Sequence, residues 1–273
     1  MIFVQSDDFN ISQIANSGQC FRISEQSNSE WEVIAFGKTL KIRSTNENDN
    51  NCYIFECNEK EYEEVWRDYF DMQRDYGEIK AKIKAIGDNY LINAVNFGYG
   101  MRILNQDLWE VIVSFIISQQ NNIPRIKGII KRLCAPYNSR FPSPNELVKY
   151  SEEDLIKIGL GYRARYVHNI AIAVVEGQLS FQKLKSLSYE DAVSYLKTFD
   201  GIGKKVANCI ALFGLRKLEA FPIDVWINRI LQNQYNGKFD VGLFPGYAGI
   251  VQQYMFYYER YRNTGTISYN NIS

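Results

Sequence analysis

Lys205 and Asp224 are candidate catalytic residues, because of their side chains and their positions near the starts of two expected helices. Lys205 follows a tight turn at residues 200–203 and stands near the start of an apolar helical segment, and Asp224 follows Pro222 at the start of another expected helix. A deprotonated lysine amine is a nucleophile, and a carboxylate stabilises a cationic transition state. Burial, the neighbouring Lys204 and the positive end of the helix all favour the neutral amine.

The turn before Lys205 has glycine at both tight positions, Gly201 and Gly203. Glycine has no Cβ, so the backbone can approach a partner closely, and the free amides of such a turn and of the helix start bind anions. An ordinary helical hairpin, with Asp224 only as a helix N-cap, explains each feature taken singly. The two glycines, the basic pair Lys204-Lys205 and the Pro-x-Asp sequence together favour a phosphate-binding hairpin.

The chain of 273 residues is 46% hydrophobic and 14% aromatic, which suffices for one large core or two modest ones. Its formal net charge is zero, which is unusual for a protein that binds nucleic acid. One basic face can nevertheless bind phosphates, whatever the total charge. Basic residues cluster at two places: Arg125, Lys127, Lys131 and Arg132, and Lys204, Lys205, Arg216 and Lys217.

The five cysteines lie apart and form no C-x-x-C pair, so the sequence predicts neither a disulfide framework nor a zinc site. The N-terminal segment has too short an apolar run for a signal peptide, and no segment has the length and composition of a membrane span. We therefore expect a protein of the cytoplasm.

Residues 1–58 have the composition of β structure, and the rest is mostly helical. Residues 31–43 and 52–57 have strand character, separated by a polar loop at 44–51. Asn58 is placed to cap a helix over residues 59–72, and helical spacing continues from Tyr76 almost to the end. These patterns predict an α+β chain, with an N-terminal antiparallel twisted β-sheet domain and linker helices over residues 1–98 and a mostly α-helical domain over 99–273.

Six segments occur in the order of a known enzyme family. They are Ser17–Arg22, Val65–Phe70 with Tyr76-Gly77, Asp107–Ile126, Gly159–Tyr166, the hairpin segment GIGKKVANC at residues 201–209, and Tyr247–Phe256. Together they cover nearly the whole chain and resemble the helix-hairpin-helix DNA glycosylases, in the branch of the 8-oxoguanine DNA glycosylases. Some members of this superfamily carry an iron–sulfur cluster on C-terminal cysteines, but no cysteine follows Cys209 here, so no cofactor or metal is expected.

The resemblance implies a base-excision repair enzyme, a bifunctional glycosylase and DNA lyase acting as a monomer on double-stranded DNA with an oxidised guanine. Lys205 would attack C1′ and form a Schiff base that permits β-elimination of the 3′ phosphate. Lys204 is the competing nucleophile, but adjacent helical residues diverge by about 100°, so only one can face the pocket, and the family match selects Lys205. Asp224 would stabilise the oxocarbenium-like sugar while also capping its helix.

The resemblance also implies a pocket for the extruded base. The Gly18 carbonyl would accept from the N7–H that distinguishes 8-oxoguanine from guanine, whose N7 is a bare acceptor. Cys209 and Phe256 would sandwich the base, and Gln252 would contact its Watson–Crick edge. Cys209 and Phe256, taken singly, are also ordinary core residues.

The remaining implied residues would hold the DNA around the extruded base. Tyr162 would be the wedge, although a core tyrosine fits the sequence comparably well. Trp226 stands where a phosphate-contacting histidine is common, and Gln120 replaces the usual asparagine, which puts fine specificity in doubt. The residues that would read the opposite cytosine are Gln120, Arg125 and Arg163, and those at the DNA backbone are Gly201, Gly203 and Lys204.

Three other functions remain open. A monofunctional glycosylase for alkylated bases would share the fold and the aspartate but would need no lysine at position 205. A non-catalytic DNA clamp would need no buried carboxylate after Pro222. A phosphate-binding protein for sugars or nucleotides would normally carry a P-loop or dinucleotide fingerprint, which this sequence lacks.

Overall fold

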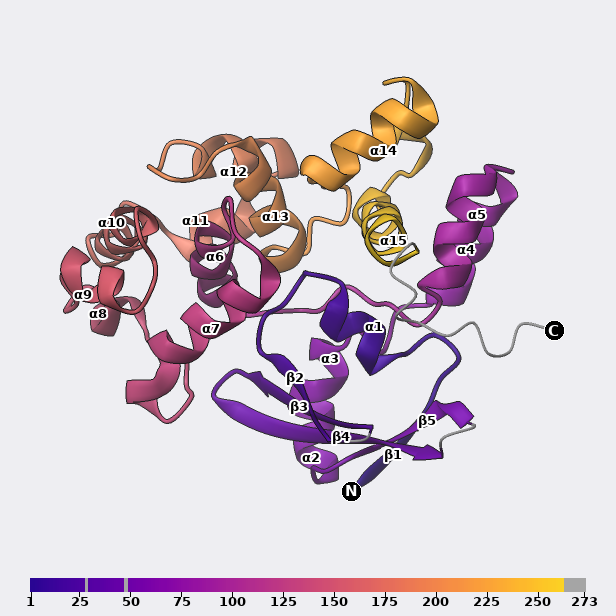
Figure 1. Cartoon of the computed structure of the whole chain (residues 1–273), viewed down its shortest axis with the longest axis horizontal. Coiled ribbons are helices and arrows are strands. Elements are labelled where there is room, and N and C mark those ends of the chain that lie inside the picture. Colours follow the sequence, from indigo (N-terminus) through magenta and orange to yellow (C-terminus); the bar gives the residue numbers. More distant parts are fainter. Residues whose placement is uncertain (28, 47–48, 263–273) are drawn as a thin grey trace.

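The computed structural model describes residues 1–27, 29–46 and 49–262. A five-stranded antiparallel sheet forms the N-terminal part, with the strand order β1-β5-β4-β3-β2 (Figure 1). The strands are β1 (Ile2–Gln5), β2 (Ile23–Ser27), β3 (Glu30–Ala35), β4 (Lys38–Asn46) and β5 (Asp49–Phe55). Strand β3 alternates strictly between buried and half-buried residues, as expected of a sheet with one face on a core.

The expected strand at residues 31–43 is two strands joined by a hairpin. Phe36 and Gly37 both have positive φ, 52° and 72°, and turn β3 back into β4. The expected polar loop at residues 44–51 is also wrong in part, because β4 extends to Asn46 and β5 begins at Asp49. Ladder hydrogen bonds use backbone groups only, so polar residues can extend a hairpin. Residues 47 and 48 of that loop lie outside the described residues.

The expected helix after Asn58 is present but shorter and less regular. The Asn58 side chain accepts a hydrogen bond from the Glu61 amide at 2.8 Å, which confirms the cap. The helix passes from α2 (Glu59–Glu61) through a π-helical turn, η1 (Tyr62–Trp66), to α3 (Arg67–Tyr69). It ends before residue 72 because Asp71 adopts a left-handed φ of 49°.

The chain from Tyr76 onward is helical, which confirms the predicted α+β class. No helix within the described ranges is long and apolar enough to cross a membrane. The remaining helices are α1 (Ile11–Asn16), α4 (Tyr76–Ala85), α5 (Asn89–Phe97), α6 (Leu108–Ile117), α7 (Ile123–Cys134), η2 (Ala135–Tyr137), α8 (Pro144–Leu147), α9 (Glu152–Lys157), α10 (Arg163–Val175), α11 (Phe181–Ser186), α12 (Tyr189–Leu196), α13 (Lys204–Gly214), α14 (Val225–Tyr235), η3 (Val241–Leu243) and α15 (Ala248–Tyr261).

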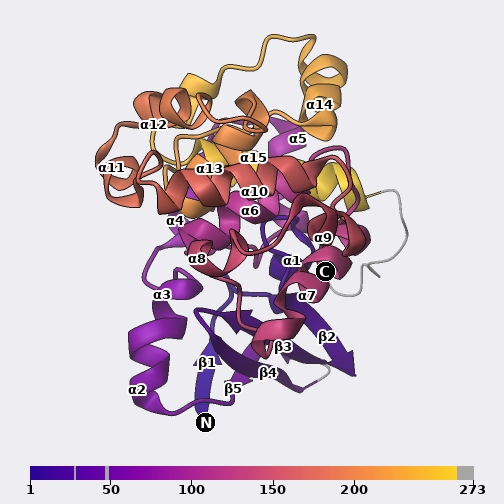
Figure 2. The ribbon, with the colours of Figure 1, turned by 90° about the vertical axis from the view of Figure 1, so that its left-hand side faces the viewer.

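Two hydrophobic cores hold these elements, one under the sheet and one among the helices. Figure 2 shows the sheet at the bottom of the view and most of the helices above it. The sheet core includes Phe55 of β5 together with Trp66 and Phe70. Helices α4 and α5 contribute Ile83 and Leu91 to the helical core, although they precede residue 98. The domain boundary at residue 98 stays a prediction.

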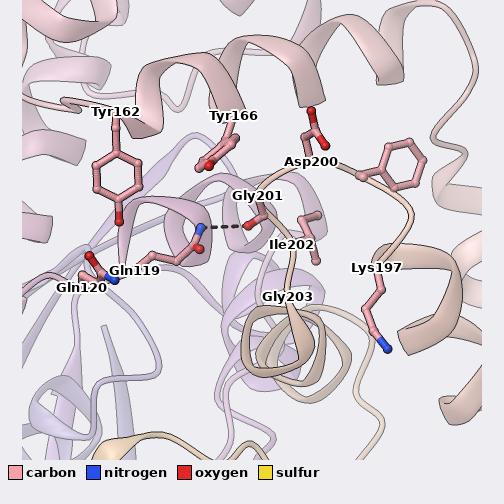
Figure 3. A pocket seen from close by; sticks show the side chains of 10 residues that line it. Gln119, Gln120, Tyr162, Tyr166, Lys197, Asp200, Gly201, Ile202 and Gly203 are labelled. Carbon is pink, nitrogen blue, oxygen red and sulfur yellow. Dashed lines mark hydrogen bonds between the residues drawn. The ribbon is translucent and has the colours of Figure 1, made fainter.

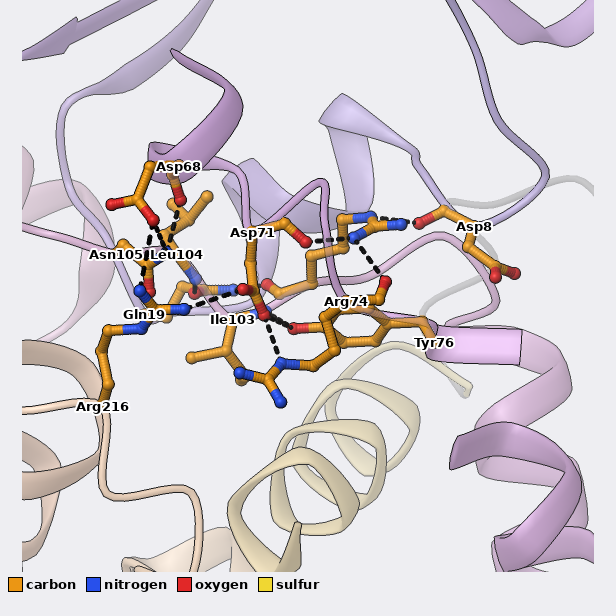
Figure 4. A network of polar contacts seen from close by, with 11 residues as sticks. Asp8, Gln19, Asp68, Asp71, Arg74, Tyr76, Ile103, Leu104, Asn105 and Arg216 are labelled. Carbon is orange, nitrogen blue, oxygen red and sulfur yellow. Dashed lines mark hydrogen bonds and ion pairs between the residues drawn. The ribbon is translucent and has the colours of Figure 1, made fainter. Parts of the chain in front are cut away.

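A polar network around the buried Asp71 joins the segment after α3 to the segment after α13 (Figure 4). Asp71 accepts from Tyr76 at 3.1 Å and pairs with Arg74 at 2.6 Å and with Arg216 at 2.9 Å. Lys217 donates to the Leu187 carbonyl at 2.8 Å. Arg216 and Lys217, two members of the second predicted basic cluster, therefore have partners within the fold, although Arg216 is exposed. That this cluster binds phosphate stays a prediction.

Candidate active site

A pocket of about 890 Å³ opens where the end of α1, the loop after α6 and the helices α13, α14 and α15 meet. Most of the residues that the sequence predicted for the site line this pocket, although they come from segments far apart in the chain. Those lining residues are Gly18, Gln120, Gly203, Lys204, Lys205, Cys209, Asp224, Gln252 and Phe256.

Helix α13 places Lys205, rather than Lys204, toward the interior. Lys204 is exposed, whereas Lys205 is half-buried and its Nζ lies 5.3 Å from the centre of the Phe115 ring. Burial raises the pKa of the Cys209 thiol, and the neighbouring Lys205 opposes the rise. Cys209 follows Lys205 by one helical turn, so the two side chains share a face of α13. Lys205 therefore combines a partly apolar setting with access to the pocket.

The Asp224 carboxylate caps α14, as the sequence predicted. Its Oδ1 accepts from the amides of Trp226 at 3.0 Å and Ile227 at 2.9 Å. Among the described residues none donates to Oδ2, so one oxygen holds the helix and the other stays available in the pocket. Capping and chemistry are compatible in this arrangement.

Gly18 forms one wall of the pocket in a left-handed conformation, with φ of 76°. A Cβ at this position would lie only 3.2 Å from the ring of Phe256, so glycine keeps the backbone close to that ring. The next residue, Gln19, fixes this segment: it is fully buried, donates to the Arg102 carbonyl at 2.7 Å and accepts from the Leu104 amide at 2.8 Å.

The hairpin between α12 and α13 borders a second pocket of about 500 Å³, which Tyr162 also lines (Figure 3). The Gln119 side chain donates to the Gly201 carbonyl at 2.8 Å, which ties the hairpin to the loop after α6. The amides of Gly201 and Gly203 donate to no acceptor among the described residues. The turn therefore offers free donors beside a hollow, as an anion site requires.

Replacing Gly201 by alanine should destabilise the hairpin. Gly201 has φ of 81°, and a Cβ there would overlap the ring of Tyr166. Backbone strain of this kind costs about 1–3 kcal/mol, and the clash adds to it. Gly203→Ala is the matched control, because Gly203 has a negative φ and open space where its Cβ would lie. Thermal denaturation measures the effect. An equal fall in the melting temperature of both variants would contradict this explanation.

The residues expected around an opposite base differ in their environments. Tyr162 is 52% exposed, so it is not the core tyrosine that the sequence left open. Arg163 is buried, and its guanidinium donates to the carbonyls of Gln119 and Gln120, the latter at 3.0 Å. It thereby supports Gln120, which has a left-handed φ of 46°. Arg125 is exposed on the first turn of α7, outside both pockets.

Sequence reasoning missed several residues of this site. Gln19 holds the Gly18 segment, and Phe115 packs against Lys205. Gln253 and Arg260 line the main pocket beside Gln252 and Phe256. Gln19 and Gln253 each stand next to a predicted residue, but adjacency on a chain does not reveal which side chains meet in the fold.

Two family models match the chain in succession. Residues 1–112 match the N-terminal domain of 8-oxoguanine DNA glycosylase, and residues 113–239 match the HhH-GPD superfamily of base-excision DNA repair proteins. The curated N-glycosylase/DNA lyase of Saccharomyces cerevisiae is 34% identical over 158 residues, which cover 50% of this chain and 42% of that protein. The matches to three curated N-glycosylase/DNA lyases, one of them a probable one, span about half of those proteins' length, between 42% and 58%.

Two solved structures resemble the chain over 96% of its length. The 8-oxoguanine glycosylase/lyase of Clostridium acetobutylicum, in complex with duplex DNA containing cytosine opposite 8-oxoguanine, is 33% identical with a TM-score of 0.86, covering 96% of this chain and 99% of that one. The 3-methyladenine DNA glycosylase of Archaeoglobus fulgidus is 20% identical with a TM-score of 0.73 over the same shares, which shows a common fold alone. With both domain models matched in order and a full-length relative at one-third identity, this chain belongs to the 8-oxoguanine DNA glycosylase family of helix-hairpin-helix proteins.

Proposed function

We propose that this protein removes 8-oxoguanine from duplex DNA, preferentially opposite cytosine, as a bifunctional glycosylase and lyase of base-excision repair. The observation that carries the proposal is the shared pocket: the half-buried Lys205 and the free Oδ2 of Asp224 line the same cavity as Gly18, Gln252 and Phe256. A nucleophile, a carboxylate and a base-sized enclosure thus meet at one place. The expectation of a cytoplasmic monomer stays a prediction.

Extrusion of the base precedes the chemistry, because C1′ is inaccessible inside the stack. The free amides of Gly201 and Gly203 would bind a backbone phosphate, with the exposed Lys204 beside them. The exposed ring of Tyr162 would enter the gap that the extruded base leaves. Phe256 and Cys209 would enclose the base, and the Gly18 carbonyl would accept its N7–H, which guanine lacks.

The reaction balances with the residues of the chain and one water. The Lys205 amine forms a bond to C1′ as the C1′–N9 bond breaks, and the base leaves with the electron pair and takes up a proton. Oδ2 of Asp224 stabilises the positive charge that develops on the sugar. Loss of the amine proton and opening of the sugar ring give the Schiff base. Removal of a C2′ proton then expels the 3′ phosphate, and water finally releases Lys205.

Recognition of the opposite cytosine would fall mainly to Arg125. Extrusion of the lesion leaves the cytosine edge with two acceptors, O2 and N3, and a guanidinium donates to both but has no acceptor of its own. Arg125 is exposed and available, whereas Arg163 must exchange carbonyl partners on the loop for the cytosine. Thymine presents N3–H and adenine keeps only one acceptor on that edge, so both fit less well.

Arg125→Met should flatten the preference for cytosine more than it slows excision opposite cytosine. The lost discrimination is about ten- to hundredfold, the value of a good specific base contact. Single-turnover excision of 8-oxoguanine opposite each of the four bases measures it. Lys131→Met, an exposed charge farther along the same helix, is the matched control and should keep the ranking. Equal wild-type rates opposite all four bases would refute the assignment.

A substrate panel tests the proposed function against its alternatives. Duplex oligonucleotides carry 8-oxoguanine, hypoxanthine or an alkylated adenine, and gels score strand cleavage with and without alkali. We expect cleavage of the 8-oxoguanine duplex without alkali. Release of alkylated adenine with cleavage only after alkali would favour a monofunctional glycosylase, and binding without any base release would favour a clamp.

A further inference from the structure

Two adjacent buried glutamines on α15 form a chain of hydrogen bonds beside the pocket. Gln252 and Gln253 are 3% and 4% exposed, and both line the cavity. The Gln252 amide nitrogen donates to the Pro222 carbonyl at 3.1 Å. The Gln253 amide nitrogen donates to Oε1 of Gln252 at 3.0 Å. Gln252 therefore has a partner on each end of its amide group.

These two hydrogen bonds favour one orientation of the Gln252 amide. A backbone carbonyl only accepts, so the end of Gln252 that faces Pro222 must be the nitrogen. The oxygen of Gln252 then faces Gln253, which must present a donor. Turning the Gln252 amide over would bring its oxygen against the Pro222 carbonyl. Gln253 would then either face it nitrogen to nitrogen or turn over as well, and turning over would leave the Gln253 amide nitrogen buried without an acceptor. Without Gln253, only the first of these two penalties remains.

The fixed orientation matters because the Watson–Crick edges of guanine and adenine have opposite patterns. Guanine offers an acceptor at O6 and a donor at N1–H, whereas adenine offers a donor at its amino group and an acceptor at N1. The amide of Gln252, held as observed, keeps one lone pair on oxygen and one hydrogen on nitrogen for a ligand. It matches guanine-type edges, and an adenine-type edge requires the reversed amide.

We propose that Gln253 is a specificity-determining positioning residue, which holds the Gln252 amide for guanine-type lesions and against adenine-type lesions. This inference rests on the proposed function, because it presumes that a purine enters this pocket. Oε1 of Gln253 is buried without a hydrogen-bond partner among the described residues. An apolar side chain would fill the same space with no unpaired acceptor, so packing alone does not explain a glutamine here. Its amide donor does.

The decisive comparison uses 8-oxoguanine and 8-oxoadenine, each opposite cytosine. The two bases share the N7–H and the 8-oxo group, so their difference lies at the Watson–Crick edge. Gln253→Met keeps the length of the side chain and removes the donor. We expect the single-turnover excision ratio of 8-oxoguanine to 8-oxoadenine to fall about tenfold in this variant, within the range for one specific base contact. Cleavage at a preformed abasic site needs Lys205 but no base contact, so retained cleavage in the variant reports a folded enzyme.

A second background separates positioning from packing. In Gln252→Ala, addition of Gln253→Met should leave the ratio unchanged, because Gln253 acts through Gln252. Gln253→Glu puts an acceptor against Oε1 of Gln252, so it should lower the ratio at least as far as methionine, and it provides a second test where Gln253→Met fails to fold.

A wild-type ratio in both Gln253→Met and Gln253→Glu, or an undiminished effect of Gln253→Met in the Gln252→Ala background, would overturn the inference while leaving the proposed function intact. A wild-type enzyme that releases no 8-oxoguanine would instead overturn both.

Discussion

Replacement of Lys205 by glutamine is expected to abolish the covalent intermediate and nearly all base release. Glutamine keeps the length of most of the side chain and its place against Phe115, but its amide is not a nucleophile. Removing the nucleophile of an enzyme that works through a covalent intermediate costs on the order of 10³-fold in turnover or more. Borohydride traps the Schiff base as a stable protein–DNA adduct, so the yield of trapped adduct and the single-turnover rate measure the two effects.

Lys204→Ala is the comparison that gives this result its meaning. Lys204 is exposed at the start of α13, and Asn208 bonds to its backbone carbonyl rather than to its side chain. The variant should bind DNA more weakly because it loses one phosphate partner, yet it should form the adduct at saturating enzyme. Undiminished trapping in Lys205→Gln, or loss of trapping in Lys204→Ala, would show that Lys205 is not the nucleophile.

Asp224→Asn should lose most turnover while it still folds and binds lesion DNA. An asparagine oxygen can keep the cap on the amides of Trp226 and Ile227, so α14 is preserved. The negative charge is lost, and electrostatic stabilisation of a transition state is typically worth on the order of 10²–10³ in rate. Single-turnover kinetics and a binding titration on the same duplex separate the two roles.

Asp224→Ala is the partner variant, because it removes the cap as well as the charge. It should lower the free energy of unfolding by about 0.5–2 kcal/mol relative to Asp224→Asn, which is the usual value of a helix N-cap. If Asp224→Asn itself melts earlier and loses binding in proportion to turnover, the carboxylate serves the helix and not the reaction.

Turns and helix caps could be predicted from the sequence, because each depends on residues within one short segment. The glycines of the hairpin, the cap at Asn58 and the cap at Asp224 act within a few residues, and the structure has all three. The positive φ of Gly201 and the crowding of Tyr166 above it explain in physical terms why a glycine stands there. The prediction that Gly18 and Phe256 share one site came from the family resemblance and not from the local sequence pattern.

Contacts between distant segments were not readable. Nothing in the sequence indicated that Arg163 and Arg216 have partners within the protein. In the structure Arg163 donates to the carbonyls of Gln119 and Gln120. Arg216 forms ion pairs with Asp68 and Asp71. A charge on a chain does not say whether a partner lies nearby in space. The same limit hid Gln253, whose importance depends on which amide it meets.

The turn between β3 and β4 was missed for a local reason. Residues 31–43 have the composition of one long strand. Phe36 adopts a left-handed φ that residues with a Cβ rarely take, so its residue type did not indicate a turn. Gly37 was the available turn signal. The neighbouring β-rich residues outweighed it, although a glycine between two strands is a common hairpin position.

Identification of the residue that carries the trapped sugar tests the central claim most directly. The wild-type protein is incubated with an 8-oxoguanine–cytosine duplex and borohydride, the adduct is digested, and mass spectrometry locates the modified residue. We predict that the deoxyribose remnant is attached to Nζ of Lys205. Attachment to any other residue, or release of 8-oxoguanine with no adduct at all, would contradict a mechanism in which Lys205 attacks C1′.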